Sequence, residues 1–456
     1  MIRKLLLALM GVILVGLGAV AGTAVAIATA REAAKKQAVE NAERDAVAAQ
    51  NAAIQAAATQ AAAEKAAESK VAESKVAESK VAESKVAAAA LEPVATEPAA
   101  PAERSGKETP APNTVVAGDN AEPLFHDIHF HLTNYLQEGI DTNRMLDIMG
   151  GRVGRVALFG IPLLQKWDPF LNGERRPKYY LETGAELYYY SFIDAMIARQ
   201  YLRLKEKDRA RFDPFIVGSN PTDMNGKEHI RNVLLTFPGV FVGIGEFSIH
   251  KELVTPKVTG HAASLLNPAV GSILEFAAET GLLVVLHCDI DEIRPTPDRP
   301  AHLDDLKRLF AKHPKANIIY AHTGLGRFVG PSKNHVGFLR EIVADPTLSH
   351  VSLDISWDEV AKWVVRDAES TKAWAELINE YPDRFVFGTD SVAPQSVEGY
   401  LKCYLDYEPL WNLLTPAASR AVRLGNYERL VNAARPKVRA WEEKNLAEDD
   451  EPIIIP

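Results

Sequence analysis

The apolar residues divide the chain into an N-terminal part without regular alternation and a longer part, from about residue 124, in which short apolar runs alternate with helical patterns. The runs are short and rich in β-branched residues, which is typical of buried strands. Eight of them are predicted as strands, over residues 124–131, 153–159, 212–218, 241–247, 282–287, 317–322, 350–355 and 384–390.

Helical patterns separate these predicted strands. One helix has clear boundaries, because Asn267 and Pro268 fit its first turn and Gly281 fits its end. Strands that alternate with helices form βαβ units with a parallel sheet, and eight units close a barrel. We therefore predict an α/β fold, a (β/α)8 TIM barrel over residues 123–445. The stretch 162–211 is long and rich in Tyr and Arg, and we interpret it as an enlarged second unit over the barrel mouth.

The first thirty residues are predicted to be a membrane or signal helix. Arg3 and Lys4 precede residues 5–30, which carry no charge and end in a small-x-small pattern. At ~1.5 Å per residue this uncharged run exceeds the ~30 Å of membrane hydrocarbon. An uncleaved inner-membrane anchor, with the barrel in the periplasm of the cell envelope, is favoured over a cleaved signal peptide that releases the protein into the periplasm.

The residues between the anchor and the barrel are predicted to be a spacer. Residues 31–90 are rich in Ala with scattered Glu, Lys and Gln, which favours a solvated helical stalk. Within it Val-Ala-Glu-Ser-Lys repeats, but a five-residue period does not form a heptad seam. Residues 91–122 concentrate Pro among Ala, Glu and Thr and are interpreted as a disordered linker. Residues 446–456 are interpreted as an acidic C-terminal tail.

Composition narrows the classes of partner. A formal charge of -9 argues against a broad nucleic-acid-binding surface. Two cysteines provide neither a disulfide framework nor a Cys-rich zinc site. We expect a small-molecule substrate, contact with the membrane through the N-terminal helix and no nucleic acid, and the composition is compatible with a homo-oligomer.

Polar residues close several of the predicted strands. His129 and His131 lie two residues apart on the first strand, so their side chains share one face. Because the C-terminal strand ends of a barrel converge on its active site, the polar residues at these ends are predicted to meet. Imidazole and carboxylate together suit a divalent metal, with Zn favoured and Mn, Fe or Ni as alternatives. The six predicted ligands are His129, His131, Glu246, His287, His322 and Asp390.

Together these residues resemble the amidohydrolase superfamily, in particular its amidohydrolase-related, metal-dependent barrels, over about residues 124–435. The motifs that carry the resemblance are the Asp-x-His-x-His opening at Asp127, Ala321-His322-Thr323-Gly324, Gly388-Thr389-Asp390-Ser391 and Gly425-Asn426-Tyr427-Glu428-Arg429-Leu430.

The resemblance implies a ligand set. A first metal would lie on His129, His131 and Asp390. His287 and His322 would bind a second metal, or His322 would orient the substrate, and Glu246 would bridge the metals. Many relatives carry a carboxylated Lys on the fourth strand, so the Glu at this position leaves one versus two metals open.

The implied reaction is hydrolysis, in which a metal-activated water attacks an amide, lactone or ester. Asp390 is interpreted as the general base and His322 as a second catalytic residue. A metal-dependent carboxy-lyase on the same barrel is the alternative, and a non-catalytic cell-envelope binding or scaffold protein is the alternative of another class.

Residues just beyond strand ends are candidates for substrate contact: His250, Lys251, Arg327, Trp357 and Ser391.

Overall fold

The chain divides into residues 1–99 and residues 100–456. The computed structural model describes residues 122–260 and 264–449, all of which belong to the second part. The predicted anchor and stalk, and the linker up to residue 121, lie outside the described residues. Among the residues that are described, no helix is long and apolar enough to cross a membrane.

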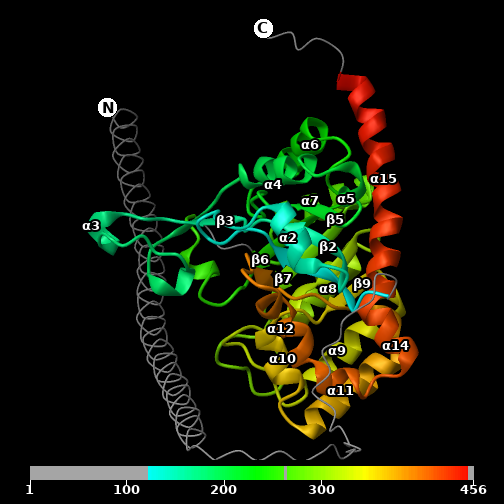
Figure 1. The fold of residues 1–456 in the computed structure, drawn as a ribbon. Helices are drawn as coiled ribbons and strands as arrows, with labels where there is room; N and C mark the ends of the chain where they lie inside the picture. The colour runs from blue at the N-terminus through cyan, green and yellow to red at the C-terminus, as the bar shows by residue number, and fades with distance from the viewer. Residues whose placement is uncertain (1–121, 261–263, 450–456) are drawn as a thin grey trace, which may run out of the picture. The chain divides into compact units, whose positions relative to one another are not determined.

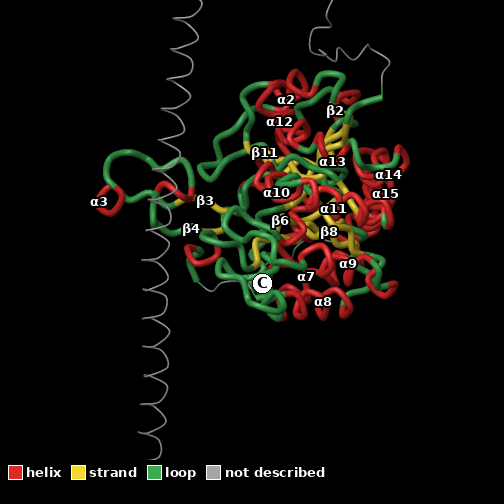
Figure 2. The backbone as a smooth tube through the Cα atoms, turned by 90° about the horizontal axis from the view of Figure 1, so that it is seen from below, coloured by secondary structure: helices red, strands yellow, loops and turns green. Residues whose placement is uncertain are grey.

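The described residues form one curled, parallel main sheet with helices around it (Figures 1 and 2). All eight predicted strands are present in it. Their order is β10-β9-β8-β7-β6-β5-β2-β1-β11, and every neighbouring pair is parallel. The strands are β1 (Phe125–His131), β2 (Val153–Phe159), β5 (Phe212–Ile216), β6 (Gly243–Ile249), β7 (Leu283–Cys288), β8 (Asn317–Tyr320), β9 (Val351–Asp354), β10 (Phe385–Val386) and β11 (Ser391–Val392).

The sheet closes through the predicted eighth strand, which is split into two short pieces. β10 pairs with β9 and β11 pairs with β1, so this one segment joins both edges of the sheet. Between the pieces, the carbonyl of Phe387 accepts from the backbone N–H of Ile128 at 3.1 Å. Gly388 allows this close approach, because a Cβ there would lie 2.8 Å from the backbone nitrogen of His129. The predicted (β/α)8-type architecture agrees with this topology.

The main helices are α2 (Thr142–Met149), α4 (Ile193–Leu202), α6 (Gly226–Thr236), α7 (Pro268–Thr280), α8 (Leu303–Lys312), α9 (His335–Val343), α10 (Asp358–Val364), α11 (Ala368–Glu380), α12 (Val397–Asp406) and α15 (Asn426–Asp449). Helix α7 has the predicted ends: the Asn267 side chain accepts from the backbone of Ala269, and Gly281 is left-handed with φ 82°. Helix α15 continues into the range 446–456 that was predicted as an acidic tail and ends at Asp449, and residues 450–456 lie outside the described residues.

The last helix is pinned to the barrel by the Gly-Asn-Tyr-Glu-Arg-Leu motif at its start. The Tyr427 hydroxyl donates to the buried carboxylate of Asp213 at 2.6 Å, and the Arg155 guanidinium donates to the same carboxylate. The Asn426 amide donates to the carbonyls of Pro382 and Phe385 at 2.7 and 2.8 Å. This motif therefore holds the fold together and lies away from the strand ends that carry the predicted ligands.

The enlarged second unit is an arm that leaves the barrel after β2 and returns to it. Strand β3 (Leu163–Gln165) pairs antiparallel with β4 (Leu187–Tyr189), and the arm carries the short helix α3 (Pro169–Asn172) away from the sheet (Figures 1 and 2). Tyr179 and Tyr180, between α3 and β4, line a cavity together with His131 of β1. The arm thus contributes to the mouth of the barrel, as expected.

Candidate metal centre

The first strand, the turn after β8 and the split eighth strand bring three histidines and a carboxylate together. His129 and His131 are buried on β1, two residues apart on one face. His322 lies in the turn after β8 with a positive φ of 56°, and Asp390 lies before β11 with φ 49°. The backbone N–H of Asp390 donates to the carbonyl of His129 at 2.8 Å, which fixes the carboxylate beside the imidazoles.

Each of these three imidazoles is oriented through its Nδ1. The Ser356 hydroxyl donates to Asp354 at 2.7 Å and therefore accepts from the Nδ1–H of His322. Such contacts leave the Nε2 lone pair of each ring free for a ligand. The Nδ1 contacts are His129 with Asp354 Oδ2 (2.9 Å), His131 with the Gly160 carbonyl (3.1 Å) and His322 with Ser356 Oγ (3.0 Å).

The three Nε2 atoms face two carboxylates. Their distances to Asp390 oxygens are 3.6 Å from His129, 3.2 Å from His131 and 3.8 Å from His322. Their distances to oxygens of the buried Glu246 are 4.0, 3.7 and 3.5 Å in the same order. Two sets of ligand atoms lie close enough together for one ion each, namely His129, His131 and Asp390, and His129, Glu246 and His322.

The donor chemistry fits a divalent cation. His129 Nε2 and His322 Nε2 are buried and have no hydrogen-bond partner within the described part of the chain. A buried polar atom without a partner is costly, and a cation between the Nε2 atoms and the carboxylates would satisfy both. Nitrogen and oxygen donors in this mixture suit a transition metal.

At this cluster, neighbouring buried groups shift the pKa values of His129 and Asp390 toward the charged forms. Burial lowers the pKa of His129, but Asp354, Asp390 and Glu246 outweigh it and raise that pKa to about 9. Burial raises the pKa of Asp390, but the neighbouring histidines, His129 first, prevail and hold it below its usual range. The cluster therefore presents an ionised carboxylate beside an imidazole that binds a proton readily in the absence of a metal.

His287 is arranged differently from the other three histidines. Its Nδ1 lies 2.7 Å from Glu246 Oε1, and its Nε2 lies 3.0 Å from Asp289 Oδ1, so both ring nitrogens contact carboxylates. Burial lowers the pKa of His287 to about 3, with Lys251 contributing. The Lys251 ammonium lies 3.1 Å from Glu246 Oε1. Burial raises the pKa of Glu246, but Lys251 and His287 outweigh it and hold this pKa well below its usual range.

A cavity of about 220 Å³, here called the mouth cavity, opens beside the cluster. His131 and Asp390 form part of its wall, and Lys251 and Arg327 supply cationic groups. Arg327 lies over the Trp357 ring at 5.7 Å from its centroid. The rest of the wall is aromatic and apolar: Tyr135, Ile161, Tyr179, Tyr180, Trp357 and Val392.

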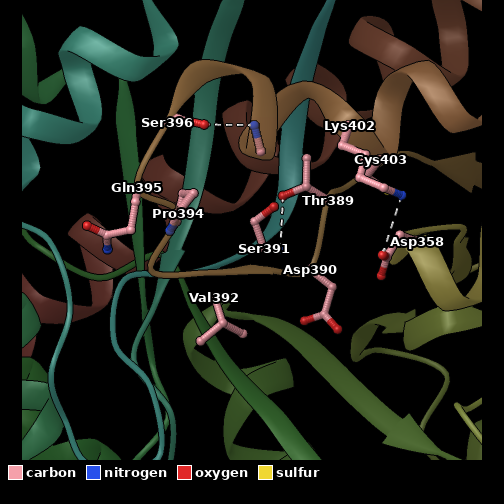
Figure 3. A pocket seen from close by; sticks show the side chains of 11 residues that line it. Asp358, Thr389, Asp390, Ser391, Val392, Pro394, Gln395, Ser396, Lys402 and Cys403 are labelled. Carbon is pink, nitrogen blue, oxygen red and sulfur yellow. Dashed lines mark hydrogen bonds and ion pairs between the residues drawn. The ribbon is translucent and has the colours of Figure 1, made fainter. Parts of the chain in front are cut away.

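The five candidate substrate residues occupy three places. Lys251, Arg327 and Trp357 line the mouth cavity. Ser391 lines a different cavity that adjoins Asp390 (Figure 3). His250 stacks on His302, with ring centroids 4.0 Å apart, and lines neither cavity.

Several residues that shape the site were not assigned a role from the sequence. Asp354 ends β9 as a polar residue after an apolar run, so the criterion that selected the ligands also applies to it. Asp127 accepts from the backbone of His129 and Thr389 and from the Thr389 and Tyr400 hydroxyls, and so ties β1 to the eighth strand. Asp289 directly follows β7 and lies two residues after His287, so the search for polar residues just beyond strand ends also applies to it.

A family model described as amidohydrolase matches part of the chain. Residues 249–432 match this family. Over this range the resemblance to the amidohydrolase superfamily is confirmed. The matched range includes His287, His322 and Asp390, whereas His129, His131 and Glu246 precede it.

The chain is similar to several solved structures. One is a candidate 2-pyrone-4,6-dicarboxylic acid hydrolase from Pseudomonas putida, with 12% identity, TM-score 0.43, and coverage of 68% of this chain and 97% of that one. An amidohydrolase from Burkholderia multivorans with bound Zn has 13% identity and TM-score 0.42, covering 68% and 99%. Dihydroorotase from Campylobacter jejuni has 12% identity and TM-score 0.41, covering 70% and 87%. No curated protein matches the sequence.

Proposed function

We propose that the barrel is a metal-dependent hydrolase that cleaves an amide, lactone or ester bond of a small molecule. The observation that carries the proposal is the set of three buried imidazoles, each held through Nδ1, whose Nε2 atoms face Asp390 and Glu246 within 4.0 Å. The match of residues 249–432 to the amidohydrolase family supports the same reaction class.

His129, His131 and Asp390 would hold the metal, with Glu246 and His322 facing it. We propose one ion, with Zn favoured and Mn, Fe or Ni as alternatives. A bound divalent ion would lower the pKa of a water molecule and polarise the substrate's carbonyl oxygen. The role of His287 as a ligand stays a prediction, because both of its nitrogens contact carboxylates.

Asp390 has the position and charge of a proton carrier. Its carboxylate borders the mouth cavity, and the nearby histidines keep it ionised. It would accept a proton from the attacking water and deliver that proton to the departing oxygen or nitrogen. His322, whose ring lies 5.1 Å from that of Trp357, would orient the scissile group beneath the aromatic wall.

The carboxy-lyase is retained as the second candidate because of two cations. Lys251 and Arg327 both line the mouth cavity. Lys251 already pairs with Glu246 and Arg327 with Glu359 at 2.7 Å, so a substrate carboxylate would share these cations. Release of CO₂ without consumption of water would identify this reaction. A non-catalytic binding role gains no specific support from the site.

The cellular setting rests on residues outside the described ranges. The uncharged run over residues 5–30 and the Ala-rich stretch after it support an exported protein anchored at the inner membrane by a stalk. Protease accessibility of the barrel in spheroplasts would distinguish this placement from a cytoplasmic one.

The proposed function is tested with the full chain purified without chelators. About one equivalent of a transition metal, with chelator-sensitive hydrolysis of a lactone, ester or amide panel, is expected. Asp390→Asn should lower kcat by about 10²–10⁴-fold, the range for loss of a general base. Asp383→Asn is the matched control, because Asp383 is exposed and precedes β10 at the opposite end of the strand. Absence of both metal and turnover, even after Zn or Mn is added, would contradict the proposal.

A further inference from the structure

Asp390 lies between two cavities. One is the mouth cavity. The other, here called the side cavity, has a volume of about 400 Å³ and is lined by the segment 389–396, which includes β11, and by residues of helices α10 and α12 (Figure 3). Asp390 and Val392 belong to the walls of both cavities. A bond that reacts at Asp390 could therefore have one of its substituents in each space.

The two cavities differ in chemistry. The mouth cavity is aromatic and carries two cations, Lys251, which pairs with Glu246 at 3.1 Å, and Arg327, which pairs with Glu359 at 2.7 Å. The side cavity offers Ser391, Gln395 and Ser396. Its charged residues are Asp358, Asp390 and Lys402, and the Lys402 ammonium pairs with Asp358 at 3.7 Å and also with Asp406. Such a wall provides hydrogen-bond donors and acceptors but, among the described residues that line it, no unpaired cation for an anionic group, which suits a neutral hydroxylated group.

We propose that the side cavity is the subsite for the leaving group and takes a neutral, hydroxyl-bearing alcohol. This proposal rests on the proposed hydrolase function. The oxygen of water forms a bond to the acyl carbon, and the bond from that carbon to the alcohol oxygen breaks. Asp390 takes the proton from water and gives it to the alcohol oxygen, so that the acid remains in the mouth cavity and the alcohol leaves through the side cavity.

Gly399 provides a variant that can fill this cavity without disturbing the fold. It lies in the first turn of α12 and lines the side cavity. A Cβ at this position would meet only Ser396 Oγ among the described residues, at an ordinary contact distance of 3.4 Å. Leu at a helical position is favoured over Gly by roughly 0.5–1 kcal/mol, so Gly399→Leu should fold and occupy the cavity.

The kinetic test compares the methyl and glyceryl esters of benzoic acid. Gly399→Leu is expected to raise KM for the glyceryl ester at least tenfold and to change kcat/KM for the methyl ester less than twofold. Gly399→Ala, the matched control, should give a much smaller increase. Equal loss for the two esters, or no loss for either, would overturn the subsite.

A binding measurement separates the subsite from the hydrolase proposal. In saturation-transfer NMR on the metal-loaded wild type, free glycerol should receive magnetisation, and Gly399→Leu should abolish the effect. This result would support the subsite even if neither ester were hydrolysed, in which case only the reaction class would be wrong. Equal transfer in both proteins, or none in the wild type, would overturn the subsite whatever the enzyme hydrolyses.

Discussion

The two sides of the candidate metal centre contain the same residue types but differ in how their charges are matched. On the side of β1 and the eighth strand, His129 and His131 use Nδ1 for structural contacts and turn Nε2 toward Asp390. On the side of β6 and β7, Glu246 is already held by Lys251 and His287. On the first side, buried imidazole nitrogens and carboxylate oxygens can still bind a cation. On the second side, the charges of neighbouring residues already balance one another.

The difference shows that a count of histidines and carboxylates does not give the number of metals. An ion on the first side would satisfy the buried Nε2 of His129, which has no hydrogen-bond partner among the described residues. A second ion on His287 would have to displace one of its two carboxylate contacts. We therefore expect a single ion centred on the first side.

The largest effect is expected from removing the cation of the second side. In chelator-treated protein, Lys251→Met would leave the buried Glu246 without its ammonium partner and lower the free energy of unfolding by about 3–5 kcal/mol. Added Zn should recover much of this loss, because the ion supplies the missing positive charge. Urea unfolding with and without Zn measures both values.

Lys402→Met is the control for this substitution, because Lys402 is also paired with carboxylates but its side chain is 57% exposed. Its loss should cost less than about 1 kcal/mol. If Lys251→Met were as mild as the control, the idea that the second side balances its own charge would be wrong.

The two sides should also differ in their response to pH in chelator-treated protein. The pKa of His129 is raised to about 9, so the folded state holds this proton more tightly than the unfolded state, where the pKa is about 6.5. The resulting stabilisation is complete below pH 6.5 and is lost as pH rises through 9. It amounts to about 3 kcal/mol. The pKa of His287 is lowered to about 3, so its stabilisation is instead lost as pH falls below 6.5.

Urea unfolding at pH 6 and pH 10 checks this contrast. The free energy of unfolding should fall between pH 6 and pH 10 in the wild type. In His129→Asn this fall should be smaller by about 3 kcal/mol. His287→Asn should leave this alkaline difference unchanged. A wild-type loss that persists fully in His129→Asn would mean that another group carries it.

A smaller effect, on metal affinity, is expected from a substitution of Asp354, which contacts Nδ1 of His129. Asp354→Asn keeps the size of the side chain but removes the charge that orients the His129 ring. Loss of such an outer partner costs about 10–100-fold in metal affinity. Competition with a zinc-binding dye measures the affinity, and Asp289→Asn on the second side is the matched control, for which less than a threefold change is expected. Equal effects would remove the distinction between the two sides.

The sequence was sufficient for the repeating architecture. All eight strands followed from β-branched runs, and helix α7 begins and ends where Asn267 and Gly281 indicate. The division of the eighth strand into β10 and β11 could not be predicted, because it depends on contacts with β9 and β1. The pairing of β3 with β4 lies in the arm, where no alternation of apolar and polar residues marks a strand.

For the site, sequence position identified which residues converge but not what each nitrogen contacts. Strand ends led to His129, His131, His322 and Asp390, which lie within one cluster. The contacts around His287 also involve Asp289 and Lys251. Asp289 contacts Nε2 of His287, and Lys251, five residues after Glu246, folds back to contact the Glu246 carboxylate. The Lys251 contact comes from the conformation of the loop after β6, on which residue spacing carries no information.

The most direct test of the single-ion centre is the metal content of three full-length proteins purified in the same way: wild type, His131→Asn and His287→Asn. Elemental analysis should find about one transition-metal ion per chain in the wild type and in His287→Asn, and much less in His131→Asn. Two ions in the wild type, or loss of metal from His287→Asn comparable to that from His131→Asn, would contradict a centre built on β1 and the eighth strand.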